Sequence, residues 1–377
     1  MGKLVAVVGV VVSLPVLAVA SLYLVGWSSS ATALCFSTVA SVVTLLLYAA
    51  TSELDNFSLA SDLLRLRRVY TPEFQRMELK NYTADDVQSY YTHTTNRDYR
   101  LLRKFVGEGH HTRLSTIFSD DSHFRTSYQS LVVYAECLSK PVQRVLEVGC
   151  GRGRCSLLLG QMLRTTSFVG VDNVELQISA ARDAAYACAA DNVSFEVCDA
   201  TRLGKMRLHQ EIEPFDMIFG VESLCHMDTE TKAAAFMEQA ASLLSPGGRL
   251  VIIDGFRSST FDTCSDEQRM AMLLAESGFR INAMPAMQQW VLLAKKNGLR
   301  CVRNLTFTDE ALPFWELGWR ISRPLLLFPG LLRLVSMLSV ECRETVSTLL
   351  SVSTVAHAMR NGAAAEYGYL VFERQNL

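Results

Sequence analysis

The hydrophobic pattern divides the chain into an apolar beginning and a longer part built of short alternating segments. Residues 4–25 carry no charged side chain, and a second uncharged run covers residues 31–50 after a short polar stretch. Each run has about the length of one bilayer crossing, which takes ~20 residues. Because backbone groups in lipid must be satisfied within the segment, two such runs with a short link predict a transmembrane helical hairpin.

Charges beside these runs predict the orientation of the hairpin. Lys3 precedes it, and Arg65, Arg67 and Arg68 follow it, which places both ends in the cytosol. This interpretation predicts a protein of the endoplasmic reticulum or another endomembrane, with the rest of the chain facing the cytosol. An alternative takes the first run as a cleaved secretory signal ending near residues 18–20, so that only the second run crosses the membrane.

Beyond the polar region that follows, short apolar runs alternate with segments of helical periodicity. Strict alternation of strands and helices predicts an α/β fold with a parallel sheet. Segments of helical periodicity follow the early strands, and the one after the first strand covers residues 156–163. Another helix is predicted over residues 285–297. The predicted strands cover residues 144–148, 168–171, 193–197, 215–221, 249–254, 299–306 and 367–372.

Charge and cysteine usage exclude two broad classes of partner. The formal net charge is −2, so the chain has no general basic field for a phosphate backbone, and we expect no nucleic-acid partner. The ten cysteines show no pair at the spacing of a zinc knuckle or redox motif, so we expect neither a metal nor a disulfide. Reduced, buried thiols fit a domain that faces the cytosol.

A glycine-rich turn after the first strand supplies the strongest chemical signal. Gly149, Gly151 and Gly153 lie between that strand and the next helix, where glycine permits close approach of a ligand to backbone donors. Alone, this spacing also suits NAD or a bare structural turn. Asp172 ends the second strand, where a carboxylate can bind ribose hydroxyls, and Asp199 follows the third strand, where one can bind an adenine amine.

Taken together, residues 143–254 resemble the class I S-adenosylmethionine-dependent methyltransferases. Besides the glycines and the two acids, Glu147 and the Pro246-Gly247-Gly248 turn match motifs of that family. The resemblance implies S-adenosylmethionine as the cofactor and a Rossmann-like seven-stranded methyltransferase sheet with flanking helices, whose last strand runs antiparallel between the fifth and sixth. The predicted cofactor-binding residues are Glu147, Gly149, Cys150, Gly151, Gly153, Asp172, Asn173, Gln177, Asp199, Ala200 and Val221.

The segment after the fourth strand is similar to that of sterol 24-C-methyltransferases and tocopherol-type methyltransferases. Glu222 is followed four positions later by His226, as in the sterol enzymes, although their aromatic, glycine-rich upstream segment is not recognisable in residues 90–118. These two are the predicted catalytic residues, as carboxylate and base for the cation formed when an alkene carbon is methylated. The alternatives are a hydrogen-bonded structural histidine and a glutamate that merely contacts cofactor or backbone.

The predicted organisation has three parts: a membrane anchor over residues 1–52, a helical linker and cap over residues 53–135, and the methyltransferase domain over residues 136–377. Insertions at about 256–283 and 308–365 are candidate lids. The apolar stretch within residues 325–340 favours an interfacial helix or the roof of an apolar pocket. We therefore expect a membrane-associated enzyme with a lipid-like small-molecule acceptor, with O- or N-methylation and a catalytically silent cofactor-binding protein as alternatives.

Overall fold

The computed structural model describes residues 81–93, 128–206, 213–326, 329–360 and 363–375. The predicted hairpin over residues 4–25 and 31–50, like the alternative secretory signal, lies outside these ranges. In the described parts of the chain, no helix is both long enough and apolar enough to cross a bilayer.

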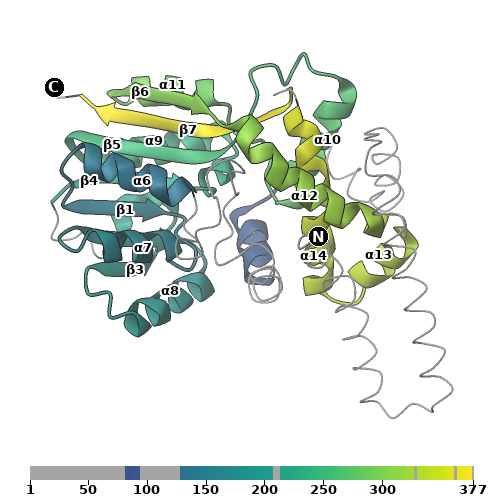
Figure 1. Ribbon diagram of the computed structural model, residues 1–377, viewed down its shortest axis with the longest axis horizontal. Helices are drawn as coiled ribbons and strands as arrows, with labels where there is room; N and C mark the ends of the chain where they lie inside the picture. The colour runs from purple at the N-terminus through teal and green to yellow at the C-terminus, as the bar shows by residue number, and fades with distance from the viewer. Residues whose placement is uncertain (1–80, 94–127, 207–212, 327–328, 361–362, 376–377) are drawn as a thin grey trace, which may run out of the picture.

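Seven strands form one sheet in the order β3-β2-β1-β4-β5-β7-β6 (Figure 1). The first five pair in parallel, whereas β7 runs antiparallel to both β5 and β6. The predicted Rossmann-like sheet, with its last strand inserted between the fifth and sixth, is therefore confirmed. The strands are β1 (Arg144–Val148), β2 (Ser167–Asp172), β3 (Val193–Val197), β4 (Phe215–Val221), β5 (Leu244–Arg257), β6 (Leu299–Thr306) and β7 (Ala365–Arg374).

Strand β5 is longer than the six residues predicted for it. It begins at Leu244, which pairs with Phe215 across a register shift, so the Pro246-Gly247-Gly248 segment lies within the strand rather than before it. At its other end, Arg257 pairs with Ala365 of β7. The extension carries β5 past the edge where the parallel strands end, so it helps to build the space beyond them.

Helices cover both faces of the sheet because side chains alternate along each strand. Val145 packs into the core beneath α6 (Tyr128–Ser139), α7 (Arg154–Met162) and α8 (Glu175–Ala187). Its neighbour Leu146 packs into the opposite core beneath α9 (Glu230–Leu243) and α11 (Met287–Lys296). The result is a three-layer α/β domain whose two cores share the sheet.

A separate group of helices stands at the carboxyl ends of the parallel strands, to the right in Figure 1. It comprises α10 (Asp266–Gly278), α12 (Thr308–Leu326), α13 (Pro329–Ser336) and α14 (Val340–Met359), and it arises from the two predicted insertions. The described part of the predicted N-terminal cap contributes a helix over residues 84–93. These helices cover the sheet edge at which ligands of α/β proteins bind.

Helices α10 and α14 pack closely, with a polar seam between them. Arg280, which follows α10, donates a hydrogen bond to Glu344 of α14 at 2.7 Å. Arg257 of β5 binds the fully buried Glu276 of α10 through two contacts of 2.7 Å, which ties α10 to the sheet. At Gly278 the two helices approach so closely that a Cβ would lie 2.8 Å from the Ser351 Cβ and 1.4 Å from its Oγ. A side chain at this point would force the helices apart.

We predict that Gly278→Ala lowers the free energy of unfolding by about 1–3 kcal/mol, because the added methyl overpacks this contact. Gly330→Ala is the matched control, since nothing lies within 4 Å of a Cβ there. That change should leave stability unaltered or raise it by up to about 1 kcal/mol. Urea unfolding of the two variants measures the difference; equal stabilities would contradict the close packing of α10 and α14.

Candidate active site

A cavity of about 530 Å³ lies at the carboxyl ends of β1, β2, β3, β4 and β5 and continues beneath the helices that cover them. The predicted catalytic residues Glu222 and His226 line it, as do all the predicted cofactor-binding residues except Gly153. The structure therefore brings together, around one space, residues that come from four different strand ends. Their roles there follow from their individual contacts.

The glycine-rich loop turns sharply after β1 because three of its residues have positive φ. Gly151 (φ 53°) has nothing within 4 Å of a Cβ, so its main chain is open to a ligand. Gly149 is required for a different reason, since a Cβ there would lie 2.3 Å from the Ser223 Cβ in the loop after β4. This loop accordingly combines an open ligand-facing backbone with close contact to the neighbouring strand end.

Gly153 does not line the cavity, although the sequence pattern grouped it with the cofactor-binding residues. It precedes helix α7 with φ 73°, and a Cβ would lie 2.2 Å from the ring of Phe195 on β3. The structure thus assigns Gly153 to helix–strand packing. The motif spacing could not distinguish this role from contact with a ligand, because both roles exclude a side chain.

Glu147 is a buried carboxylate inside the strand that leads to the loop. It is 3% exposed, and its Oε2 accepts hydrogen bonds from the Ser156 amide at 3.0 Å and the Ser156 hydroxyl at 2.5 Å. A carboxylate that lies against the amide groups at the start of a helix also interacts favourably with the helix dipole. Glu147 therefore fixes the start of α7 against β1 while still lining the cavity.

Asp172 holds the glycine-rich loop from the end of β2. Its Oδ2 accepts from the Gly151 amide at 3.0 Å and its Oδ1 from the Val174 amide at 2.9 Å. Burial raises the pKa of Asp172 above its usual value, against the opposing effect of these backbone donors. Asn173 and Gln177 line the cavity beside it, as predicted for the ribose side of a nucleoside site.

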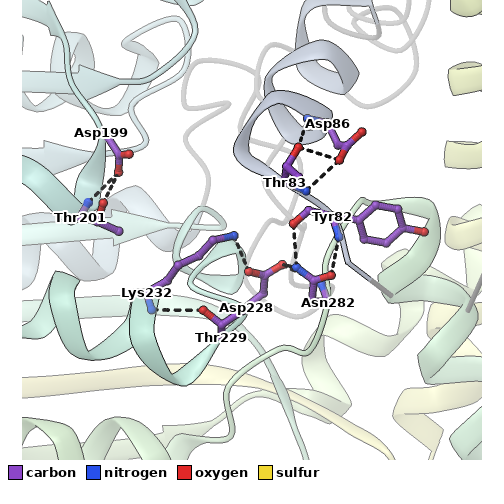
Figure 2. Close-up of polar contacts among 9 residues, drawn as sticks. All are labelled: Tyr82, Thr83, Asp86, Asp199, Thr201, Asp228, Thr229, Lys232 and Asn282. Carbon is purple, nitrogen blue, oxygen red and sulfur yellow. Dashed lines mark hydrogen bonds and ion pairs between the residues drawn. The ribbon is translucent and has the colours of Figure 1, made fainter. Parts of the chain in front are cut away.

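Asp199 and Ala200 lie at the adenine end of the predicted site. Asp199 precedes the short helix η1 (Ala200–Lys205), and its Oδ1 accepts from the amide and the hydroxyl of Thr201, both at 2.8 Å (Figure 2). The carboxylate is thereby oriented by the turn that follows it. Val221, at the end of β4, also lines the cavity.

Glu222 adopts a backbone conformation that L-residues seldom take, with φ 50° directly after β4. Its Oε1 accepts a 2.8 Å hydrogen bond from the Tyr367 hydroxyl, which itself accepts one of 2.9 Å from Gln129. Burial, together with the charge of Glu222, raises the pKa of Tyr367 well above its usual value, so the phenol remains a donor. Tyr367 thus orients the predicted catalytic carboxylate.

His226 ends the short helix η3 (Leu224–His226), and its Nε2 lies 2.7 Å from the Tyr91 hydroxyl. Burial lowers the pKa of His226 to about 4, so the imidazole is neutral near pH 7. Its Nδ1 has no hydrogen-bond partner in the described part of the chain. His226 is therefore a neutral imidazole held by an aromatic side chain from the N-terminal helix.

The helix over residues 84–93, which carries Tyr91, is tied to the loop after β4 through two polar side chains (Figure 2). Asp228 accepts from Lys232 at 2.7 Å and from the backbone and side-chain amides of Asn282 at 2.7 and 2.8 Å. Asn282 in turn exchanges two hydrogen bonds with the backbone of Tyr82, at 2.7 and 3.0 Å. This chain of contacts holds Tyr91 above His226.

Asp254 is a residue of the cavity that the sequence interpretation did not single out. It is 3% exposed near the end of β5 and accepts from the Cys225 amide at 2.9 Å and the Gly255 amide at 2.8 Å. Burial, with a contribution from the charge of Glu222, raises its pKa to about 7 against these backbone donors. Its place after the fifth predicted strand was the signal that could have identified it.

Comparisons of sequence agree with this geometry. Residues 139–305 match the family described as a methyltransferase domain. Methyltransferase GfsG of Streptomyces halstedii is 30% identical over 174 residues, which are 45% of this chain and 57% of that protein. An O-methyltransferase of Pyrenophora dematioidea is 26% identical over 218 residues, 53% of this chain and 77% of that protein. The chain thus matches little more than half the length of the first of these relatives.

Solved structures show the same fold at low sequence identity. The cyclopropane synthase MmaA2 from Mycobacterium tuberculosis has a TM-score of 0.57 and 13% identity, over 78% of this chain and 99% of that one. Geranyl diphosphate C-methyltransferase from Streptomyces coelicolor A3(2), in complex with S-adenosyl-L-homocysteine, has a TM-score of 0.52 and 16% identity, over 73% and 91% of the two chains. The likeness is one of fold.

We predict that Asp172→Ala weakens S-adenosylmethionine binding by about tenfold or more, because it removes a predicted ribose ligand and loosens the glycine-rich loop. Asp183→Ala is the control, since Asp183 is an exposed carboxylate on the next helix. Isothermal titration calorimetry gives both dissociation constants. An unchanged constant for Asp172→Ala would remove this carboxylate from the cofactor site.

Asp254 should make stability depend on pH. Its raised pKa means that the folded chain holds this proton more tightly than the unfolded chain, so its contribution to stability falls as pH rises towards 7. Asp254→Asn removes that dependence. Urea unfolding from about pH 5 to about pH 8 should therefore show the stability difference moving in favour of the variant. A difference independent of pH would contradict the raised pKa.

Proposed function

Since residues 139–305 match the family described as a methyltransferase domain, we propose that this chain is an S-adenosylmethionine-dependent enzyme that methylates a lipid-soluble small molecule at a membrane. The favoured reaction is C-methylation of a sterol or prenyl lipid. Support comes from the chemistry of the cavity beyond the cofactor residues, from the apolar runs of residues 4–25 and 31–50, and from the sequence similarity around Glu222.

The observation that carries the proposal is that one cavity joins the predicted cofactor residues to an apolar chamber, and that Glu222 is part of its lining. Helices α10, α12 and α14 supply most of the chamber wall. Among the described lining residues, the cationic side chains are Arg152 and Arg154, which belong to the glycine-rich loop rather than to the chamber. Apolar residues of the chamber include Met272, Phe279, Ile281, Met284, Phe314, Trp315, Val352, Val355 and Met359.

Such a chamber favours an acceptor that enters as a hydrocarbon and becomes transiently cationic. Bound S-adenosylmethionine supplies a methyl group already activated on a sulfonium centre. The chain must then align the acceptor, exclude water and stabilise positive charge. Aromatic faces such as Trp315 attract cations, and Glu222, oriented by Tyr367, provides a carboxylate that can also accept the departing proton.

Methylation of an oxygen or nitrogen atom is the second candidate, and His226 favours it. A neutral imidazole at the strand end can accept a hydrogen bond from the hydroxyl of an acceptor and so orient it, and its Nδ1 is not engaged by the described residues. The relative from Pyrenophora dematioidea is named an O-methyltransferase. In this reaction Glu222 would orient the acceptor rather than stabilise a carbocation.

The proposal also includes the location of the enzyme. The two apolar runs would anchor the chain as a transmembrane hairpin in the endoplasmic reticulum or another endomembrane, with the methyltransferase domain in the cytosol. An anchor of this kind would keep the apolar chamber close to the bilayer, where a lipid-soluble acceptor is concentrated. Protease protection of the full chain in microsomes tests this topology; protection of residues 128–375 would contradict a cytosolic domain.

We predict that Glu222→Gln lowers turnover of a carbon acceptor by about 100-fold or more while changing S-adenosylmethionine affinity little, because the amide can neither balance a cation nor take a proton. His226→Gln serves as the paired variant, since it should be the more damaging change if the acceptor is a hydroxyl. Turnover and cofactor affinity are measured separately for each variant. Full activity of Glu222→Gln would remove its catalytic role.

Transfer of labelled methyl from S-adenosylmethionine into a total membrane lipid extract tests the acceptor class, with Asp172→Ala as the control. Label in a nonsaponifiable sterol or prenyl product supports C-methylation of a lipid. Label in a quinone or phospholipid would instead favour a heteroatom acceptor. Cofactor binding without any label would favour the third possibility, a catalytically silent protein.

A further inference from the structure

A cluster of exposed apolar side chains lies where α13 leads into α14. Leu334, Met337, Leu338 and Val340 are 59%, 76%, 69% and 39% exposed, and they fall within seven consecutive residues. Other large exposed apolar side chains in the described part of the chain, such as Leu138 and Leu292, occur no more than two to a helix or strand. We call these four residues the α13 corner. A concentrated apolar patch of this kind marks a surface that is covered in function.

The chain links the α13 corner to two of the helices that line the apolar chamber. Helix α13 connects α12, which supplies Phe314 and Trp315 to the chamber, with α14, which supplies Val352 and Met359. In Figure 1, α13 lies at the end of this helical group that is farthest from the sheet. If an apolar phase covers the α13 corner, a ligand dissolved in that phase would be close to α12 and α14, which line the chamber.

Charges around the α13 corner fit an anionic surface. Arg333 and Arg343 are exposed on either side of it in the sequence. Of the two acidic residues that follow in the sequence, Glu344 is buried and accepts a 2.7 Å hydrogen bond from Arg280, and Glu341 is partly exposed 3.4 Å from His93. Exposed arginines beside apolar side chains are typical of segments that rest in the headgroup region of a membrane.

We propose that the α13 corner docks onto the surface of an anionic phospholipid bilayer, so that an acceptor passes from the lipid into the chamber between α12 and α14. The choice of a bilayer as the occupant follows from the same chain, whose residues 4–25 and 31–50 are uncharged runs of membrane-spanning length. The entry route rests on the proposed function. The docking itself depends only on the exposed side chains of the α13 corner, so it can be tested separately from the entry route.

Photocrosslinking of the full chain tests the docking. The chain, with p-benzoylphenylalanine at position 337, is reconstituted into vesicles of phosphatidylcholine containing a minor fraction of phosphatidylserine. Position 138 on α6 is the control, because Leu138 is similarly exposed, at 61%. A phospholipid adduct from position 337 but not from position 138 is the expected result. Adducts with residues 1–80 or with a second copy of the chain, or equal lipid labelling at both positions, would overturn the proposal.

An activity measurement tests the entry route. The triple variant Leu334→Ser, Met337→Ser, Leu338→Ser should lose about tenfold in methyl transfer to an acceptor embedded in vesicles, because those side chains no longer enter the lipid. Transfer to the same acceptor in detergent micelles should change by less than about twofold, since these exposed residues lie outside the cavity lining. Equal loss in both dispersions would overturn the route.

The matched control is Leu138→Ser, Leu176→Ser, Leu292→Ser, which removes three exposed apolar side chains from other helices. It should lose no more activity in vesicles than in micelles. If no lipid acceptor is methylated in either dispersion, the proposed function fails, while the crosslinking result still decides whether the α13 corner meets the bilayer. The two proposals can therefore fail independently.

Discussion

The close approach of the loops after β1 and β4 is the constraint on which the rest of the site depends. Gly149 and Ser223 are so near that any side chain at position 149 would collide with the serine, and the Ser223 hydroxyl donates to the Val148 carbonyl at 2.7 Å. This contact places the glycine-rich loop directly beside Glu222. The unusual backbone conformation of Glu222 belongs to the same arrangement, because it turns the chain away immediately after β4.

Burial disfavours the charged forms of the titratable side chains around this contact. Asp254, His226 and Tyr367 are all shifted towards their neutral forms, each chiefly by loss of hydration. A site that disfavours charge in its own side chains is one from which water is largely excluded. In such surroundings a developing cation interacts strongly with any carboxylate that remains ionised, since the screening by solvent is weak. The helices at the strand ends are what create this environment, so they contribute to the chemistry as well as to the shape of the chamber.

Much of this arrangement could be predicted from the sequence, because strand periodicity and parallel pairing place strand ends together. Asp172, Asp199 and Glu222 each follow an apolar run, and the structure brings all three to one cavity. Contacts between distant segments could not be predicted in the same way. The Tyr91–His226 and Tyr367–Glu222 hydrogen bonds join residues 135 and 145 positions apart. No local pattern specifies which face of a helix lies over which loop, and no glycine spacing reveals that Gly153 meets Phe195.

The position of β7 ties the acceptor end of the site to the order in which the chain is made. This strand, residues 365–374, lies inside the sheet between β5 and β6 and carries Tyr367. During synthesis the segments that bind the cofactor leave the ribosome well before β7 does. Until then β6 has no neighbouring strand of its own, and Glu222 has no phenol to orient it. A nascent chain can therefore bring the strand ends around the glycine-rich loop together first, whereas the orientation of Glu222 by Tyr367 waits for a strand that leaves the ribosome after the other six.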